Sequence, residues 1–109
     1  MNKKLTKGYI YLIGETDNPN HYKIGFTRST DIEKRKKKLQ TGNSNELFIK
    51  YTFFSNNVTK LEKMLHSHYR SYHTINEWFE ISDNETNNFI EICEKYQKII
   101  DALKDNPFF

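Results

Sequence analysis

The chain has 109 residues, a formal net charge of +3, 28% charged residues and 15% aromatic residues. This length fits one domain with little room for a second, and the single cysteine, Cys93, excludes an internal disulfide and a cysteine zinc cluster. No apolar run approaches the ~20 residues of a membrane span, and residues 1–4 lack the apolar region of a secretory signal. We therefore expect an intracellular protein without membrane contact, whose mildly basic charge permits a polyanionic partner.

The first two predicted elements are strands of a β-hairpin. Residues 8–13 (GYIYLI) are continuously apolar and rich in strand-forming residues, which indicates a buried strand. Residues 14–20 are dense in turn residues and include Pro19, which cannot donate to a sheet ladder, so they predict a loop. Residues 21–27 (HYKIGFT) alternate again and predict the return strand, which places Lys23 beside Tyr11. Gly25 within that strand indicates a bulge or a close approach of another group.

A helix is predicted immediately after the hairpin. Residues 30–33 fit a capping box that starts the helix near Asp31, and Gly42 suits the left-handed position that ends it. Its apolar stripe is thin and consists of Ile32 and Leu39. Arg35 lies on that same inward face, whereas the four neighbouring lysines point elsewhere. This asymmetry singles out Arg35.

The rest of the chain predicts one more strand and two more helices. Residues 46–54 form the third strand, and Asn56 or Asn57 caps a helix over residues 58–72 that carries Glu62 at the edge of its apolar stripe. A buried carboxylate there needs a charged partner or a metal. His66 follows one turn later. Residues 77–81 form a short strand or an extended piece, and residues 82–85 are a second capping box before the last helix, which ends near residue 103.

We therefore expect an α+β fold: a small antiparallel three-stranded sheet, made of the hairpin plus a third strand, flanked by three helices. The single domain would span residues 8–104, with tails at residues 1–7 and 105–109. Pro107 in the second tail cannot continue a helix.

Five short motifs occur in the order of a known family. Tyr9–Tyr11 matches the first motif and Lys23–Gly25 the second; Asp31–Arg35 matches a helix with an invariant arginine, Leu61–His66 a helix with a metal-binding glutamate, and Glu77–Phe79 a strand signature. The chain thus resembles the GIY-YIG nuclease superfamily, in particular its phage and viral branch, whose second motif reads Tyr-Lys-Ile-Gly. The resemblance covers roughly residues 8–90. It departs from the superfamily pattern at Lys23, where the second catalytic tyrosine usually lies.

Phosphodiester hydrolysis needs an activated water, stabilisation of the phosphoryl oxygens and help for the leaving oxygen. The resemblance implies that Tyr11 and Lys23 activate or orient the water, that Arg35 binds the scissile phosphate, and that Glu62 holds one Mg²⁺ or Mn²⁺. The catalytic candidates are Tyr9, Tyr11, Lys23, Arg35, Glu62 and His66. The basic residues that would track a nucleic-acid backbone are Arg28, Lys34, Lys37, Lys38 and Arg70.

Each role has a structural alternative. Lys23 is either the base or a charged phosphate clamp. Glu62 either holds the metal or forms an internal salt bridge with Arg35 or Lys23, and His66 is either a site residue or structural. Residues 78–79 (Trp-Phe) favour a place in the core over a stacking platform.

We expect a metal-dependent endonuclease that hydrolyses DNA, with RNA as a substrate still open. No recognition domain is evident, so low intrinsic sequence specificity is expected, with a monomer or weak dimer and a specificity partner. The main alternative is a catalytically inactive DNA-binding module on the same fold. A third reading is a protein-interaction domain whose aromatic residues only build the core.

Overall fold

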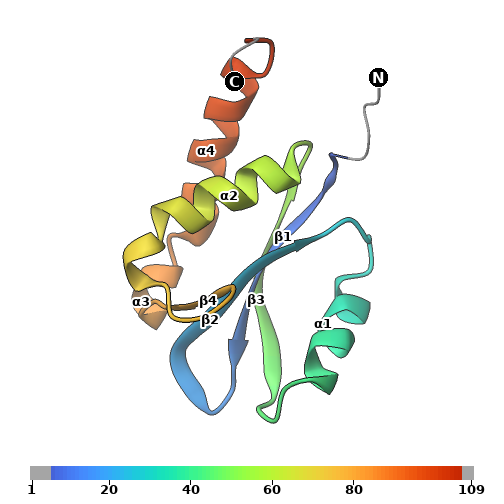
Figure 1. Cartoon of the computed structure of the whole chain (residues 1–109), viewed down its shortest axis with the longest axis vertical. Helices are drawn as coiled ribbons and strands as arrows, with labels where there is room; N and C mark the ends of the chain where they lie inside the picture. Colours follow the sequence, from blue (N-terminus) through green and yellow to red (C-terminus); the bar gives the residue numbers. More distant parts are fainter. Residues whose placement is uncertain (1–5, 107–109) are drawn as a thin grey trace.

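A computed structural model describes residues 6–106 and shows a twisted antiparallel sheet with helices on both faces (Figure 1). The strand order is β3-β1-β2-β4. The strands are β1 (Gly8–Glu15), β2 (Asn18–Thr27), β3 (Leu47–Ser55) and β4 (Trp78–Glu80). The helices are α1 (Ile32–Thr41), α2 (Val58–His68), α3 (Asp83–Thr86) and α4 (Phe89–Leu103), with a 3-10 turn η1 (Arg70–Tyr72) after α2. The expected α+β class is correct.

The expectation of three strands was wrong, because β4 adds a fourth strand to the outer edge of β2. Only three residue pairs join these strands, from His21 opposite Glu80 to Lys23 opposite Trp78. Such a short edge strand carries too little alternation to be distinguished by sequence from an extended connection.

The helix count and one helix length also differ from the prediction. The α2 helix ends at His68 instead of Tyr72 and continues as η1. Ser82 caps α3, where its side chain accepts a hydrogen bond from the amide of Glu85, as the second capping box predicted. However, α3 is only four residues long, and α4 starts separately at Phe89.

The hairpin loop is shorter than expected, since β1 reaches Glu15 and β2 begins at Asn18. Pro19 nevertheless lies within β2. The register shifts between Gly14, which pairs with Tyr22, and Glu15, which pairs with Asn18. Pro19 therefore falls in an irregular stretch where β1 offers no paired residue, so its missing N–H disrupts no ladder bond.

Strand alternation divides the sheet into two unlike faces. Ile10, Leu12 and Ile24 point toward α2 and α4 and join the main apolar core with Leu61 and Phe89. Tyr11 and Ile13, which alternate with Ile10 and Leu12 in β1, point to the opposite face, which α1 covers (Figure 1). This second face has a smaller cluster of three buried residues, Tyr11, Ile13 and Leu47.

The α1 helix differs in detail from the predicted one. Its N-cap is Asp31, whose side chain accepts a hydrogen bond from the amide of Lys34, so the predicted capping box is displaced by one residue. Gly42 has φ −97°, which is not left-handed as expected. The reason is that the helical turn continues to Gly42, whose amide donates a hydrogen bond to the carbonyl of Leu39 at 3.3 Å. No residue of α1 is buried.

The predicted tails lie mostly outside residues 6–106. Thr6 is not free, because its carbonyl accepts a hydrogen bond from the amide of Val58 at the start of α2. Asp105 and Asn106 are exposed beyond α4. Within residues 6–106, no helix has both the length and the apolarity that a bilayer crossing requires.

Candidate active site on the face covered by α1

Tyr11 forms the centre of this face because Gly25 leaves room for it. The two residues are register partners in β1 and β2. A Cβ placed on Gly25 would lie only 2.5 Å from the phenol oxygen of Tyr11 and 2.7 Å from its Cζ. The ring therefore lies directly over the glycine, which explains why the strand contains a residue without a side chain at this position.

Arg35 meets Tyr11 from α1, as its inward orientation predicted. Its Nε donates a hydrogen bond to the phenol oxygen at 3.3 Å. Burial raises the pKa of Tyr11 above its ordinary value of 10.0, and this outweighs the opposite effect of Arg35. The phenol is therefore protonated at neutral pH. Its oxygen accepts from Arg35, while its own hydrogen remains available for another acceptor.

Glu62 reaches the site from α2. One carboxylate oxygen, Oε2, is buried and has no hydrogen-bond partner. Burial and, secondarily, the negative charge of Glu77 raise the pKa of this carboxyl above 4.5, although His66 and Lys23 act in the opposite direction. An unpartnered buried carboxylate oxygen is the kind of ligand that a hard divalent cation would satisfy.

The surroundings of Glu62 limit what such a site could be. Within residues 6–106, no group of three or more His, Cys, Asp or Glu side chains is arranged to hold a metal. A multidentate protein cage is thus absent from this part of the chain. One carboxylate with several retained waters is the arrangement that Mg²⁺ tolerates. The residues present fit that ion better than Zn²⁺, which prefers three or four nitrogen or sulfur ligands.

Lys23 lies on the same face as Tyr11 but contacts Glu77, a residue of the strand signature to which the resemblance gave no chemical role. Its Nζ is 3.1 Å from Oε1 of Glu77, and it lies 5.7 Å from the centre of the Trp78 ring. Among the described residues, neither of the salt bridges expected as alternatives for Glu62, with Arg35 or with Lys23, is formed. Glu77 has instead taken the place of Glu62 beside Lys23.

His66 is held mainly by the backbone. Its Nε2 lies 2.9 Å from the carbonyl oxygen of Ile24 and 3.8 Å from Oε2 of Glu62. Its ring packs edge-on against Phe79. These contacts fasten α2 to β2 one turn after Glu62, so His66 orients the helix segment that presents the carboxylate.

A hydrogen bond and mutual charge effects link Tyr11, Lys23, Arg35 and Glu62, the four residues to which the resemblance gives chemical roles. Glu62 comes from the helix on the opposite face, yet its charge influences Tyr11, as does that of Glu77. Lys23 in turn influences Glu62. Tyr9 lies two residues before Tyr11 on the same face of β1, but its ring packs against that of Phe54, with centroids 5.4 Å apart.

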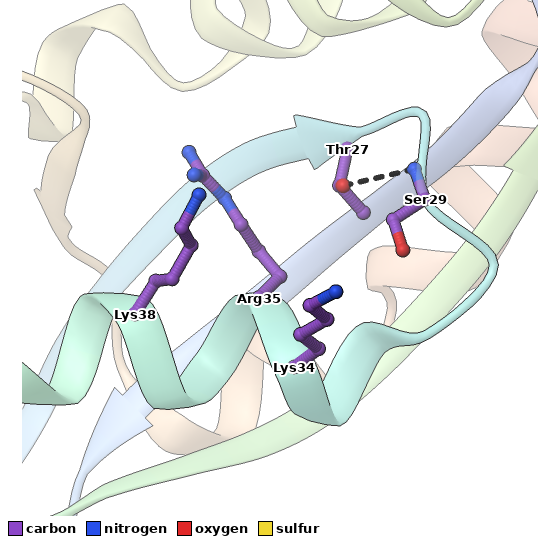
Figure 2. A pocket seen from close by; sticks show the side chains of 5 residues that line it. All are labelled: Thr27, Ser29, Lys34, Arg35 and Lys38. Carbon is purple, nitrogen blue, oxygen red and sulfur yellow. Dashed lines mark hydrogen bonds between the residues drawn. The ribbon is translucent and has the colours of Figure 1, made fainter.

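A cationic hollow of about 240 Å³ opens beside Arg35. It is lined by Thr27, Ser29, Lys34, Arg35 and Lys38. In Figure 2 the side chains of Arg35 and Lys38 extend from α1 in the same direction, and Lys34 lies nearer to Ser29. The amide of Ser29 donates a hydrogen bond to the hydroxyl of Thr27, which holds the end of β2 against the loop before α1.

A second hollow, of about 280 Å³, lies on the other side of Lys38. Its lining residues are Lys23, Lys38, Leu39, Gly42, Asn43, Leu47 and Trp78. Lys38 thus borders both hollows. The contribution of Trp78 was missed, because residues 78–79 were assigned jointly to the core; only Phe79 is buried, and Trp78 is partly exposed.

Only some of the predicted backbone-binding residues lie at these hollows. Lys34 and Lys38 line them. Lys37, on the same helix, is exposed and lines neither. Arg28 lies against the ring of Phe26, 5.4 Å from its centre, and Arg70 belongs to η1, beyond the far end of α2. The nucleic-acid-binding role of these residues stays a prediction, and the sequence could not show which of them line a hollow beside Arg35.

The geometry defines a small α+β domain with a cationic, partly buried polar site on one face of an antiparallel sheet. The sequence profile of the T5orf172 domain family matches residues 8–94, which is most of the chain. The chain therefore belongs to the T5orf172 domain family, a phage-associated family. No curated protein and no solved structure matches the chain.

Proposed function

We propose that this protein is a metal-dependent endonuclease of GIY-YIG type that hydrolyses DNA. The observation that carries the proposal is the contact between Arg35 and Tyr11, with the unpartnered carboxylate oxygen of Glu62 within electrostatic reach. A fixed cation, a neutral phenol and a free carboxylate oxygen are a combination suited to phosphate-ester chemistry. Membership of the T5orf172 family supports a nuclease or DNA-binding role.

Arg35 is the phosphate-binding residue of the proposal. Its Nε is occupied by Tyr11, which leaves the terminal nitrogens of the guanidinium for an anion in the first hollow. Guanidinium groups bind phosphate oxygens through paired, charge-assisted hydrogen bonds. Lys34 and Lys38 line the same hollow and add positive charge, so a phosphodiester there would lie against three cationic side chains of one helix.

Proton movements fall to Tyr11 and Lys23. The attacking water must lose a proton, and the leaving oxygen must gain one. Because burial keeps Tyr11 protonated, its phenol is suited to orient the water or to donate a hydrogen bond, rather than to act as a ready base. Lys23 is ion-paired with Glu77, which favours the clamp over the base.

Glu62 would hold Mg²⁺ or Mn²⁺ through its buried oxygen. Such an ion supplies positive charge for the phosphoryl oxygens and lowers the pKa of a bound water. His66 and Glu77 then serve the carboxylate indirectly. His66 fixes α2 against β2. The negative charge of Glu77 disfavours the ionised form of Glu62, and a bound cation would offset this effect.

The test is cleavage of supercoiled plasmid DNA with Mg²⁺ or Mn²⁺. The wild-type protein should convert the plasmid to nicked and linear forms. Arg35→Ala should lower the cleavage rate by about 10²–10³-fold, the usual effect of removing one group that stabilises transition-state charge. Lys36→Ala is the matched control, since Lys36 is the next residue of α1, pairs with exposed Glu33 at 3.8 Å and lines neither hollow, so this variant should cut normally. Plasmid that the wild type leaves intact with either metal would overturn the proposal.

A second candidate is a DNA-binding module without catalysis. Its motive is Lys23, which stands in place of a tyrosine and is already paired with Glu77. The neighbouring Tyr22 cannot substitute for that tyrosine, because it points to the opposite face and donates its hydroxyl to Asp83. Salt-sensitive DNA binding that is retained in Glu62→Gln, together with no cleavage by the wild type, would favour this candidate.

A further inference from the structure

The second hollow has a composition unlike that of the first. It combines two lysines, Lys23 and Lys38, with three apolar side chains, Leu39, Leu47 and Trp78. The first hollow has cations and hydroxyls but no aromatic or aliphatic lining residue among the described ones. The second hollow has a volume of about 280 Å³, just under the roughly 300–1,000 Å³ typical of small-molecule sites, so one mononucleotide unit is a suitable size.

Neighbouring side chains hold the Trp78 ring in position. Its ring stacks on His21, with centroids 4.7 Å apart and an interplanar angle of 10°. His21 is itself fixed, because its Nδ1 lies 2.7 Å from Oε1 of the buried Glu15. The Glu15 carboxylate thus holds the His21 ring, and the His21 ring supports the indole of Trp78. Of these three residues, Trp78 is the one that lines the hollow.

The position of this hollow connects it to the phosphate site. Lys38 borders both hollows, and Lys23 lines the second one from the strand next to Tyr11. A phosphodiester chain that enters the first hollow would therefore have its neighbouring nucleotide at the second. There Lys23, whose Nζ lies 5.7 Å from the centre of the Trp78 ring, would turn from the ring to the phosphate, and the apolar side chains would meet the base.

We propose that the second hollow is a subsite for one unpaired nucleotide adjacent to the scissile phosphate, so that the preferred substrate is single-stranded or locally unpaired DNA. The inference rests on the proposed nuclease function. In a duplex both faces of each base are covered by neighbouring bases, so a base reaches Trp78 only when it is unstacked. Stacking on an aromatic side chain then favours the unpaired form.

The protein contains a single tryptophan, so its fluorescence reports on this hollow directly. The experiment titrates the whole protein, in EDTA to prevent cleavage, with a dye-free 12-nucleotide oligothymidylate and with the duplex that it forms with oligodeoxyadenylate. The single strand should quench the Trp78 emission, and the duplex should quench it much less. Equal quenching by both, or no change on adding the strand, would overturn the subsite. This measurement needs no variant.

Gly42 allows the hollow to be filled without disturbing its walls. Gly42 lines the hollow, its φ is ordinary for any residue, and a Cβ placed on it meets nothing within 4 Å. Gly42→Leu should lower the affinity for the single strand by about fivefold or more, the lower end of what loss of one stacked base produces. Its affinity for the duplex should stay within about twofold. Ala102→Leu is the matched control, because it adds a leucine at an exposed position of α4 that lines neither hollow, and it should bind both like the wild type.

The outcomes separate the two proposals. Plasmid cleavage without a Trp78 response would remove the subsite and leave the nuclease. Quenching by the single strand, lost in Gly42→Leu, together with a plasmid and a single strand that both stay uncut with Mg²⁺ or Mn²⁺, would leave a nucleotide-binding subsite and remove the nuclease. If Gly42→Leu, shown by circular dichroism to be folded, binds the single strand as tightly as the wild type, the subsite is excluded.

Discussion

The face of the sheet under α2 and α4 is packed with apolar side chains, whereas the face under α1 is joined to its helix mainly by polar groups. The α2 helix buries Val58, Leu61 and Leu65 against the sheet. The α1 helix buries none of its residues. The two faces of one sheet therefore depend on different interactions.

A network around Glu15 replaces apolar packing on the α1 side. This carboxylate is 7% exposed and accepts hydrogen bonds from side chains of the hairpin and of the loop between α1 and β3. Its partners are Asn18, His21, Asn43 and Asn45. Gln40 adds a second link, because its Oε1 accepts from the amide of Leu47 at 2.8 Å. Both links lie at the C-terminal end of α1.

This difference has a functional reason. A helix that presents Arg35 and several lysines to a phosphate cannot also bury that side in apolar surroundings, because unpaired charges are costly to desolvate. Anchoring the helix by hydrogen bonds at one end leaves its other turns open to a ligand. The packed face supplies stability, and the polar face supplies the site.

The largest effect on stability is expected on the packed face. Leu61→Ala removes a fully buried side chain and should lower the free energy of unfolding by about 2–5 kcal/mol. Urea unfolding followed by circular dichroism would measure it. Lys63→Ala, exposed on the same helix, is the control and should change stability by less than about 0.5 kcal/mol. Equal losses in both variants would contradict the division of the two faces.

On the polar face, Glu15→Gln should destabilise the protein in a pH-dependent way. Burial raises the pKa of this carboxyl, but the hydrogen bonds from His21, Asn45, Asn18 and Asn43 together hold it below its ordinary 4.5. A lowered pKa in the folded state gives stability that is present above 4.5 and is lost as the pH falls through the lower value. The wild type should therefore exceed the variant by about 1–3 kcal/mol near pH 7.

The same comparison repeated along a pH series tests the cause. The difference in unfolding free energy between wild type and Glu15→Gln should shrink as the pH falls from 5 to 3. A difference that stays constant over this range would show that Glu15 acts through its shape alone and not through its charge.

Gly25→Ala tests whether the site depends on the close approach of Tyr11. The new methyl group would overlap the phenol, so the ring must move, at a cost of about 1–3 kcal/mol in stability. Cleavage should fall as well, because the contact between Tyr11 and Arg35 is broken. Gly42→Ala adds the same methyl group in open space and should leave stability and cleavage unchanged.

The smallest effect is expected from removing one hydroxyl on either face. Tyr22→Phe loses the 2.5 Å hydrogen bond to Asp83 and should lower stability by about 1 kcal/mol while cleavage is retained. Tyr11→Phe should lower the cleavage rate with little change in stability. Thermal unfolding and plasmid cleavage, measured on both variants, would sharpen the comparison of the two faces. The reverse pattern would contradict it.

The sequence could predict features that depend on neighbours in the chain. The hairpin, the inward direction of Arg35 and the opposite directions of Tyr22 and Lys23 all follow from local periodicity. The close approach at Gly25 follows from the absence of a side chain in a strand.

Features that depend on distant partners could not be predicted. Asn45 meets Glu15 across 30 residues, and Lys23 meets Glu77 across more. Nothing in the local pattern of Glu15 indicates that four side chains converge on it. Residues 77–81 were predicted as a short strand or an extended piece, but their place in the sheet could not be predicted for the same reason, since the pairing with β2 depends on where the chain returns after η1.

Tyr11 and Arg35, although hydrogen-bonded to each other, belong to segments that should open at very different free energies. Tyr11 lies in β1, one of the two inner strands of the sheet, and has a register partner on each side, Gly25 in β2 and Thr52 in β3. Its amide should exchange with deuterium only through global unfolding, whereas the amides of an unburied helix exchange through local openings. Local opening of α1 would thus break the contact between Arg35 and Tyr11 while the strand that carries Tyr11 stays folded.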